Sequence, residues 1–174
     1  MRYGAAFILS FVFALYWTPL MRKAAQQLGI VDKPDGKLKK HENATPYLGG
    51  LAVYMAFLLT VGVFTDFGQD TLGLLLSGSI ALMVGLLDDF GAMTPVQKLM
   101  GQSLAAIVLV KSGIYIKLEF IPVWLAIPLT VLWIVAVTNA LNIIDILDGL
   151  AAGVATIAAL SINPSLYKKL PFDP

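Results

Sequence analysis

Long apolar segments alternate with short polar ones along this chain. Five apolar segments approach the ~17 to 25 residues that a helix needs to cross a bilayer. They cover residues 4–20, 48–64, 71–87, 99–116 and 121–137. A sixth segment, 150–162, is shorter and leads into Asn163-Pro164, so we expect only a partial crossing there. The pattern predicts an all-α, polytopic helical membrane protein with five spans and a partial sixth.

Composition supports the same class. Hydrophobic residues make up 58% of the 174 residues and charged residues 13%, and the mean hydropathy is +0.81. These values are typical of a membrane-embedded helical bundle rather than of a soluble core. We expect one membrane-embedded domain, residues 1–162, followed by a polar tail, residues 163–174. The chain has no cysteine, which excludes disulfides, a thiol nucleophile and cysteine-ligated zinc.

Positively charged residues indicate which side faces the cytoplasm. The loop after the first apolar segment contains a cluster of them: Arg22, Lys23, Lys33, Lys37, Lys39 and Lys40. The next loop has only two charged residues, Asp66 and Asp70. We therefore expect the N-terminus outside, an uncleaved first span and a cytoplasmic first loop. Residues 88–98 and 139–148 then also face the cytoplasm, so we expect three polar segments to meet in one cleft at the membrane surface.

The first polar segment, residues 31–50, contains a run of lysines and the single histidine, His41. One interpretation is an ordinary positive-inside loop with a turn at Pro34-Asp35-Gly36. The other is an anion-binding loop in which basic side chains attract phosphate groups. The members of that loop would be Lys37, Lys39, Lys40 and His41. Gly49-Gly50 permits either a close backbone approach to a ligand or close helix packing.

The second polar segment begins with Asp88 and Asp89 at the end of the third apolar segment and continues to Lys98. The dipole at a helix C-terminus disfavours acids, so a cation should compensate them. One interpretation is a pair of solvated acids partnered by Lys98. The other is a divalent cation site, because Mg²⁺ takes one or two carboxylates together with phosphate oxygens and water.

The third polar segment places Asn139, Asn142, Asp145 and Asp148 at three-residue spacing. Each step of three residues drifts by about 60° around a helix, so these side chains form a broad stripe. A 3₁₀ turn or a helix break would align them better, and Gly149 would let the chain bend. Asparagines commonly join helices within membranes, whereas two aspartates at membrane depth favour a functional site.

Three motifs now carry a resemblance to a known family. In order and spacing, they are similar to motifs of the polyprenyl-phosphate N-acetylhexosamine-1-phosphate transferases (glycosyltransferase family 4). The three motifs are VDKPDGKLKKHENATPYLGG, GLLDDFGAMTPVQKLMGQ and NALNIIDILDGLAAG. The first motif looks more like the UDP-N-acetylglucosamine branch than the phospho-N-acetylmuramoyl-pentapeptide branch. Ile146 stands where many members have glycine, and Lys37 stands where arginine is usual, which keeps the charge but loses the bidentate fork.

This resemblance implies a phosphotransferase of bacterial cell-envelope glycan synthesis, such as lipopolysaccharide or teichoic acid synthesis. Undecaprenyl phosphate would attack the β-phosphorus of a UDP-sugar, UMP would leave, and a lipid-diphosphate sugar would remain. The implied cofactor is Mg²⁺ or Mn²⁺, and the implied location is the bacterial cytoplasmic membrane, with several crossings. The implied partners are the UDP-sugar, the polyprenyl phosphate and the membrane, with no nucleic acid. A homodimer or a complementary C-terminal half is a further possible partner.

The resemblance also implies roles for particular residues. Its catalytic set is Asp88, Asp89, Lys98, Asp145 and Asp148. Its substrate-binding set is Lys37, Lys39, Lys40, His41, Asn139 and Asn142. Its metal ligands are Asp88, Asp89 and Asp148. We favour metal-binding and orienting roles for the acids over general-base catalysis.

Two other interpretations stay open. Family members continue through further spans, so this chain can instead be an inactive truncated or split fragment that associates with a complementary half. An ion-coupled transporter would also use intramembrane acids, but such acids usually lie near the midplane in broken helices or repeats. The acids of this chain are expected at the cytoplasmic ends of spans, which disfavours transport.

Overall fold

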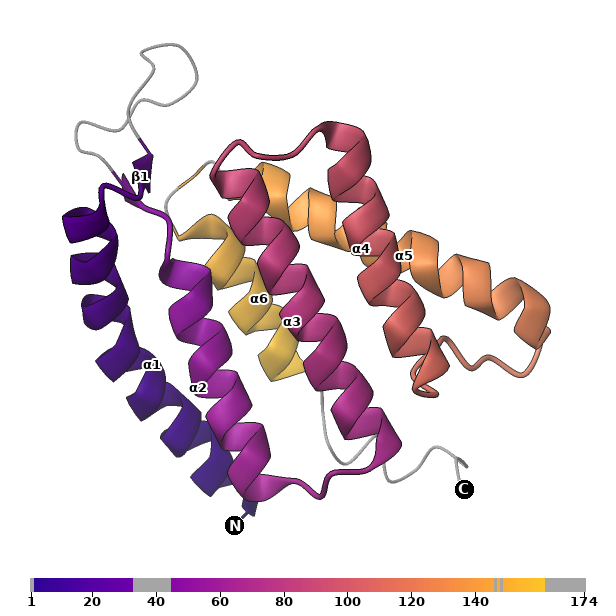
Figure 1. The fold of residues 1–174 in the computed structure, drawn as a ribbon. Helices are drawn as coiled ribbons and strands as arrows, with labels where there is room; N and C mark the ends of the chain where they lie inside the picture. The colour runs from indigo at the N-terminus through magenta and orange to yellow at the C-terminus, as the bar shows by residue number, and fades with distance from the viewer. Residues whose placement is uncertain (1, 33–44, 146, 148, 162–174) are drawn as a thin grey trace. The chain divides into compact units, whose positions relative to one another are not determined.

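The computed structural model describes residues 2–32, 45–145, 147 and 149–161. Within these residues the chain forms six α-helices and one pair of two-residue strands (Figure 1). In chain order they are α1 (Arg2–Leu28), β1 (Val31–Asp32), β2 (Thr45–Pro46), α2 (Gly49–Phe64), α3 (Gln69–Asp89), α4 (Pro95–Lys111), α5 (Val123–Ile144) and α6 (Leu150–Ser161). The predicted all-helical class is confirmed. The chain divides into two compact units, residues 1–135 and 136–174, which are described separately.

The structure supports part of the predicted number of spans. By length and composition, three of the described helices can cross a membrane, namely α1, α3 and α5. The apolar helices α2 and α6 are shorter, and α4 includes Lys98 within its 17 residues. Three of the five predicted spans are thus supported by helix length and composition. The total of five spans stays a prediction.

Several helix boundaries also differ from the predicted segments, and α4, for example, covers Pro95–Lys111 rather than residues 99–116. Helix α1 continues to Leu28, well past Leu20, and α5 continues to Ile144, past Val137. The residues that follow Leu20 are mostly good helix formers, namely Arg, Lys, Ala and Gln, so α1 extends beyond its apolar segment. Beyond Val137, α5 continues even though Thr138, Asn139 and Asn142 have lower helix propensity. Asn139 and Asn142 therefore lie within α5, as the helical stripe considered for the third polar segment requires.

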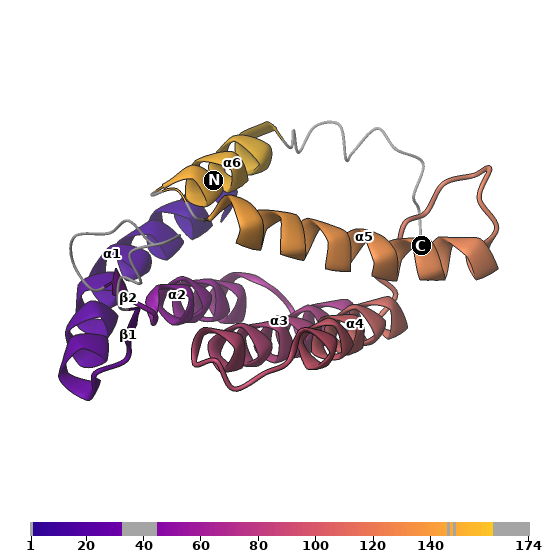
Figure 2. The ribbon, with the colours of Figure 1, turned by 90° about the horizontal axis from the view of Figure 1, so that it is seen from above.

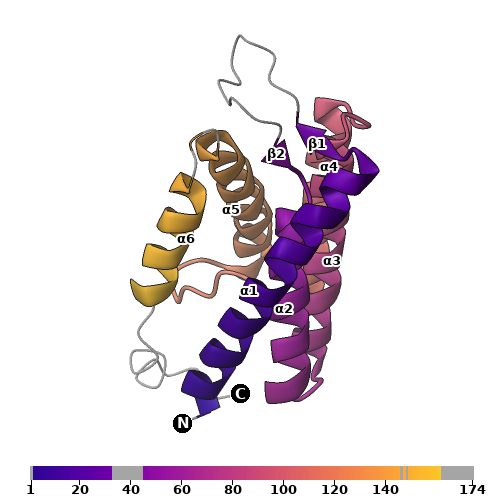
Figure 3. The ribbon, with the colours of Figure 1, turned by 90° about the vertical axis from the view of Figure 1, so that its left-hand side faces the viewer.

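In the first unit, helices α1 to α4 run alternately up and down (Figures 1 and 3). Helix α1 packs mainly against α2, and α3 packs mainly against α4. Seen from above, the four helices follow one another in chain order (Figure 2). The Tyr54 hydroxyl of α2 links the two pairs, because it lies 2.7 Å from both the Leu75 carbonyl oxygen and Ser79 Oγ of α3.

Small side chains form the contacts between these helices. Ala52, Ala56 and Thr60 recur every four residues along α2 and are buried. On α4, Ala105 and Ala106 are buried, and on α3 the buried positions are Gly73 and Val84. Close packing of small residues is the usual way in which helices associate in membranes, where lipid already solvates large apolar side chains.

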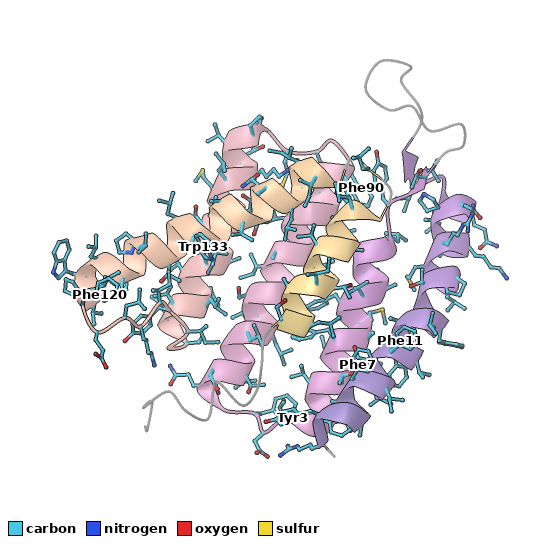
Figure 4. All side chains as sticks on the ribbon, turned by 180° about the vertical axis from the view of Figure 1, so that it is seen from behind. Tyr3, Phe7, Phe11, Phe90, Phe120 and Trp133 are labelled. Atoms are coloured by element: carbon cyan, nitrogen blue, oxygen red, sulfur yellow. The ribbon has the colours of Figure 1, made fainter. Side chains whose placement is uncertain are left out.

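The large apolar side chains point outward instead. No large side chain is fully buried in the described residues. Tyr3 and Phe120 are each 81% exposed, and Phe7, Phe11 and Trp133 are also exposed (Figure 4). A soluble domain rarely exposes so much contiguous apolar surface. This distribution is that of a helical membrane protein.

In the second unit, α5 ends at Ile144 and α6 begins at Leu150. The Asp145 amide still donates to the Leu141 carbonyl (3.1 Å), and the chain then leaves the helix. Gly149 has φ of +76°, a conformation that favours glycine. The predicted break between the helices is therefore confirmed, as is the shortness of the sixth helix.

Candidate functional site at the ends of α3 and α4

An ion pair joins the end of α3 to the start of α4. The Lys98 Nζ lies 2.6 Å from Asp88 Oδ2, and the two side chains are 17% and 29% exposed, respectively. Asp88 is in the last turn of α3, where the helix dipole disfavours an acid, and Lys98 is near the N-terminus of α4, where the dipole disfavours a cation. Each charge therefore compensates the other. The cation that was expected beside Asp88 is thus Lys98, as in the first interpretation of this segment, and the divalent cation site stays a prediction.

The end of α3 is held by a Schellman motif. The Gly91 amide donates to the Asp88 carbonyl (2.8 Å), and the Ala92 amide donates to the Leu87 carbonyl (3.0 Å). This pattern requires a left-handed residue, which is supplied by Gly91 with φ of +66°. The carbonyl of Asp88 is thus part of the cap, so the backbone that carries the acid has a defined position.

The start of α4 is held by a capping box. The Gln97 amide donates to Thr94 Oγ1 (3.3 Å), and the Thr94 amide donates to Gln97 Oε1 (2.8 Å). Pro95 occupies the first helical turn, where its missing N–H costs nothing. Lys98 follows immediately after this cap. Thr94-x-x-Gln97 is the recognisable sequence signal for this cap, and it was missed in the predictions from sequence.

The two helices also touch closely one turn below the ion pair. A Cβ atom added to Gly101 would lie 2.5 Å from Val84 Cγ2, well inside ordinary van der Waals distance. Val84 is 8% exposed, and the neighbouring Gln102 is 6% exposed. This contact was not predicted from the sequence, where its signal is the pair of small residues Gly101 and Ala105 at four-residue spacing.

Asp89 also belongs to the last turn of α3, and its side chain is exposed. Adjacent helical residues point about 100° apart, which explains why Asp88 and Asp89 have different surroundings. Asp88, Asp89 and Lys98 are therefore the predicted site residues that the structure brings together in the first unit.

The strands β1 and β2, which flank the basic loop, lie at the same end of the first unit as the C-terminal end of α3 (Figures 1 and 3). Asp88 is in the last turn of α3. The two strands pair in antiparallel fashion, with Val31 opposite Pro46 and Asp32 opposite Thr45. This pairing connects the end of α1 to the start of α2. The predicted substrate-binding residues Lys37, Lys39, Lys40 and His41 lie outside the described residues, so their role stays a prediction.

Gly49 and Gly50 are the first two residues of α2, as predicted for the start of the second span. A Cβ atom at Gly49 or Gly50 would meet no described atom within 4 Å. Within the described residues, these glycines therefore do not serve close helix packing. A role in backbone approach to a ligand stays a prediction.

The third motif belongs to the second unit. Asn139 and Asn142 lie in the last two turns of α5, and Asp145 follows in the turn as an exposed residue. Asp148 lies outside the described residues. The three described side chains gather at one end of α5, as the three-residue spacing predicted. That this motif meets the other two in one cleft stays a prediction.

The predicted metal site involves residues from both units. The described residues contain no group of three or more His, Cys, Asp or Glu side chains that could hold a metal ion. The predicted set includes Asp148, which is not among them. Asp88 and Asp89 remain the acidic pair available in the first unit, and the metal assignment stays a prediction.

An apolar cavity lies at the opposite end of the first unit. It has a volume of about 210 Å³ and lies between α1 and α2, with Arg2, Tyr3 and Phe57 among its lining residues. The Arg2 guanidinium donates to the Phe64 carbonyl beside it. The cavity is therefore separate from the acidic pair and does not contribute to the candidate site.

Comparison with known sequences identifies the family. The sequence profile described as glycosyl transferase family 4 matches residues 71–169, which include the second and third motifs. The chain belongs to glycosyl transferase family 4. The resemblance expected from the three motifs is thus confirmed. No solved structure gives a significant match to this family member.

Individual relatives in the family carry specific names. The chain is 36% identical to the probable undecaprenyl-phosphate N-acetylglucosaminyl 1-phosphate transferase of Bacillus subtilis, over 92% of this chain and 47% of that protein. It is 32% identical to the decaprenyl-phosphate N-acetylglucosaminephosphotransferase of Mycobacterium tuberculosis, over 87% of this chain and 42% of that protein. It is 26% identical to the undecaprenyl-phosphate alpha-N-acetylglucosaminyl 1-phosphate transferase of Escherichia coli K12, over 90% and 45%. This family 4 chain spans about half the length of the curated relatives that it matches.

Proposed function

We propose that the protein transfers N-acetylglucosamine 1-phosphate from UDP-N-acetylglucosamine to undecaprenyl phosphate at the cytoplasmic face of a bacterial inner membrane, and releases UMP. The family membership supports this proposal, as do the names of the three relatives, each of which joins a polyprenyl phosphate to an N-acetylglucosamine phosphate group. The exposed apolar surface supports a membrane location with several crossings.

The observation that carries the proposal is the polar centre at the ends of α3 and α4. Phosphoryl transfer depends mainly on positioning and on neutralising charge, for which a fixed acid and cation are suited. Asp88 and Lys98 hold each other at 2.6 Å, while Asp89 presents a second carboxylate beside them. The acceptor is a phosphate monoester whose second pKa is ~6, so it is largely dianionic at neutral pH and needs little general-base assistance. We therefore assign orientation to Asp88 and Lys98.

A divalent cation fits the donor set of this centre. A carboxylate offers about four lone-pair sites, so pairing of Asp88 with Lys98 through Oδ2 does not exhaust it as a ligand. Mg²⁺ or Mn²⁺ would be held by Asp88, Asp89 and Asp148 together with phosphate oxygens. Such an ion supplies charge neutralisation on the diphosphate during transfer. Asp145 would complete the acidic set, and Asn139 and Asn142 would donate hydrogen bonds to the substrate.

The basic loop has a separate proposed task. Lys37, Lys39, Lys40 and His41 would attract the anionic phosphate groups of both substrates to the membrane surface. Lysine suits this task because it acts as a strongly hydrated point charge.

A radiochemical assay tests the proposal. The purified chain in detergent receives undecaprenyl phosphate, labelled UDP-N-acetylglucosamine and Mg²⁺, and chloroform-extractable label is measured. We expect label that requires the metal and that disappears in Asp88→Asn and Asp148→Asn without loss of membrane insertion. Near-normal turnover in both variants would contradict the site assignment. Asp70→Asn, an acid at the other end of α3, is the matched control.

A second candidate is a chain that acts only together with a complementary C-terminal half or a second copy. The chain covers 47% of the Bacillus subtilis relative. Co-expression with the C-terminal half of that relative distinguishes the two candidates. Label formed only in the co-expressed sample supports the second, and label formed by the chain alone supports the first. An ion-coupled transporter is disfavoured because Asp88 and Asp89 lie at a helix end rather than in its middle.

A further inference from the structure

We propose that Gly101 is a positioning residue for the acidic centre, and that its contact with Val84 sets the distance between α3 and α4 at which Lys98 holds Asp88. This inference rests on the proposed function, because it concerns how the same centre is held. It assigns a role to two apolar positions that touch neither substrate.

Gly101 leaves no room for a larger residue beside Val84. A Cβ atom on Gly101 would lie 2.5 Å from Val84 Cγ2 and 3.4 Å from Val84 Cγ1. Carbon atoms prefer about 3.5 to 4.0 Å, so a methyl group would need about 1 Å of additional space. Valine in a helix strongly prefers one χ1 rotamer, so its methyl groups cannot turn away cheaply. The two helices must then separate or tilt.

The ends of the two helices can adapt little. The Schellman motif at Gly91 holds the end of α3, and the capping box at Thr94 and Gln97 holds the start of α4. Between them lies a short connection, residues 90–94. Lys98 is the residue that follows this second cap, and Gly101 lies one turn further along α4. A shift of α4 at Gly101 is therefore transmitted to Lys98 rather than absorbed in a flexible loop.

The ion pair itself is sensitive to such a shift. Lys98 Nζ and Asp88 Oδ2 are 2.6 Å apart, which is close to the lower limit for a charge-assisted hydrogen bond. An increase of about 1 Å would exceed hydrogen-bonding distance. Asp88 would then lose the donor that orients it. A glycine also permits a close approach at the other end of the α3–α4 contact, where a Cβ atom on Gly73 would overlap the side chain of Ser112.

Matched variants make the inference testable. Gly101→Ala introduces the clash, and Val84→Ala combined with Gly101→Ala removes it. Gly85→Ala is the control, because it adds the same methyl group to α3 where no described atom lies within 4 Å. The double variant also distinguishes the proposed effect from misfolding. If it restores the Lys98 acetylation rate and kcat, alanine at position 101 is compatible with the fold once space exists.

The first measurement does not require activity. Acetylation of each lysine in the purified 174-residue chain is timed by mass spectrometry, with Lys111 as the internal standard. An ion-paired, partly buried Lys98 should react slowly. We expect Gly101→Ala to accelerate acetylation of Lys98 several-fold. In the double variant and in Gly85→Ala, we expect Lys98 to be acetylated at the same rate as in the unsubstituted chain. Unchanged Lys98 reactivity in Gly101→Ala, or the same acceleration in Gly85→Ala, would overturn the inference.

The second measurement uses the transferase assay. A misplacement of about 1 Å can cost on the order of a hundredfold in rate, so we expect kcat of Gly101→Ala to fall by about tenfold or more. The KM values for both substrates should change little, because Gly101 does not touch them, and kcat should recover in the double variant. Lost kcat without recovery would contradict a spacing role. If the parent chain transfers no label at all, the proposed function fails, while the acetylation result still decides the role of Gly101.

Discussion

Replacing Lys98 by methionine tests the ion pair directly. The change removes the cation that lies 2.6 Å from Asp88 Oδ2 while keeping a side chain of similar length. Asp88 would then remain uncompensated at the C-terminal end of α3, where the helix dipole costs about 0.3 to 1 kcal/mol. The loss of stability should therefore exceed that of an ordinary surface lysine.

The exposure of the pair sets the expected magnitude. Exposed ion pairs contribute about 0.2 to 1 kcal/mol, whereas breaking a fully buried pair costs about 3 to 5 kcal/mol. With side chains 17% and 29% exposed, this pair is intermediate and partly screened by solvent. We expect Lys98→Met to lower the free energy of unfolding by about 1 to 2 kcal/mol. Asp88→Asn should cost a similar amount.

A double-mutant cycle isolates the interaction between the two residues. The free energy of unfolding is measured in mixed micelles by SDS titration, followed by far-ultraviolet circular dichroism, for both single variants and the double variant. We expect the double variant to be about 1 kcal/mol more stable than the sum of the single effects implies. Additive losses would refute the pairing, because they would show that Asp88 and Lys98 do not sense each other. Lys23→Met, an exposed lysine near the end of α1, is the matched control.

Further predictions address the caps, the helix contacts and the basic loop. Gly91→Ala should lower the free energy of unfolding by about 1 kcal/mol, because alanine disfavours the left-handed conformation, and the same SDS titration should show no such loss for Gly85→Ala. Tyr54→Phe removes the hydroxyl that links α2 to α3 and should cost about 1 kcal/mol, and an unchanged midpoint would show that this link is not stabilising. Lys39→Gln combined with Lys40→Gln should raise KM for both anionic substrates more than it lowers kcat, and unchanged KM values would count against the anion-binding role.

Much of the fold could be predicted from local sequence signals. Apolar length identified the helical membrane class, because backbone hydrogen bonds must be satisfied within each segment in lipid. The spacing of Asn139, Asn142 and Asp145 indicated a polar stripe on a helix, although the end of α5 at Ile144 was not predicted, and Gly149 indicated the bend. The need for a cation beside Asp88 followed from the helix dipole alone.

Helix ends were less well predicted, and the reason is physical. Hydropathy marks where lipid contact ends, whereas capping marks where a helix ends. Helix α1 continues beyond its apolar segment to a Schellman motif at Gly29, and α4 ends at another, at Gly113. These glycines are sequence signals for helix ends, and combining them with the hydropathy pattern would have placed both boundaries.

Composition, residue spacing and local capping signals were enough to assign the helical membrane class and the family, and to select the acids, lysine and asparagines of the proposed chemistry. Which helices touch, and how closely, became known only from the way the helices pack. The 2.6 Å pair of Asp88 and Lys98 depends on a glycine of α4 that accepts the side chain of Val84 from α3. That contact joins two helices through the shapes of their surfaces, and no periodicity within either helix specifies it.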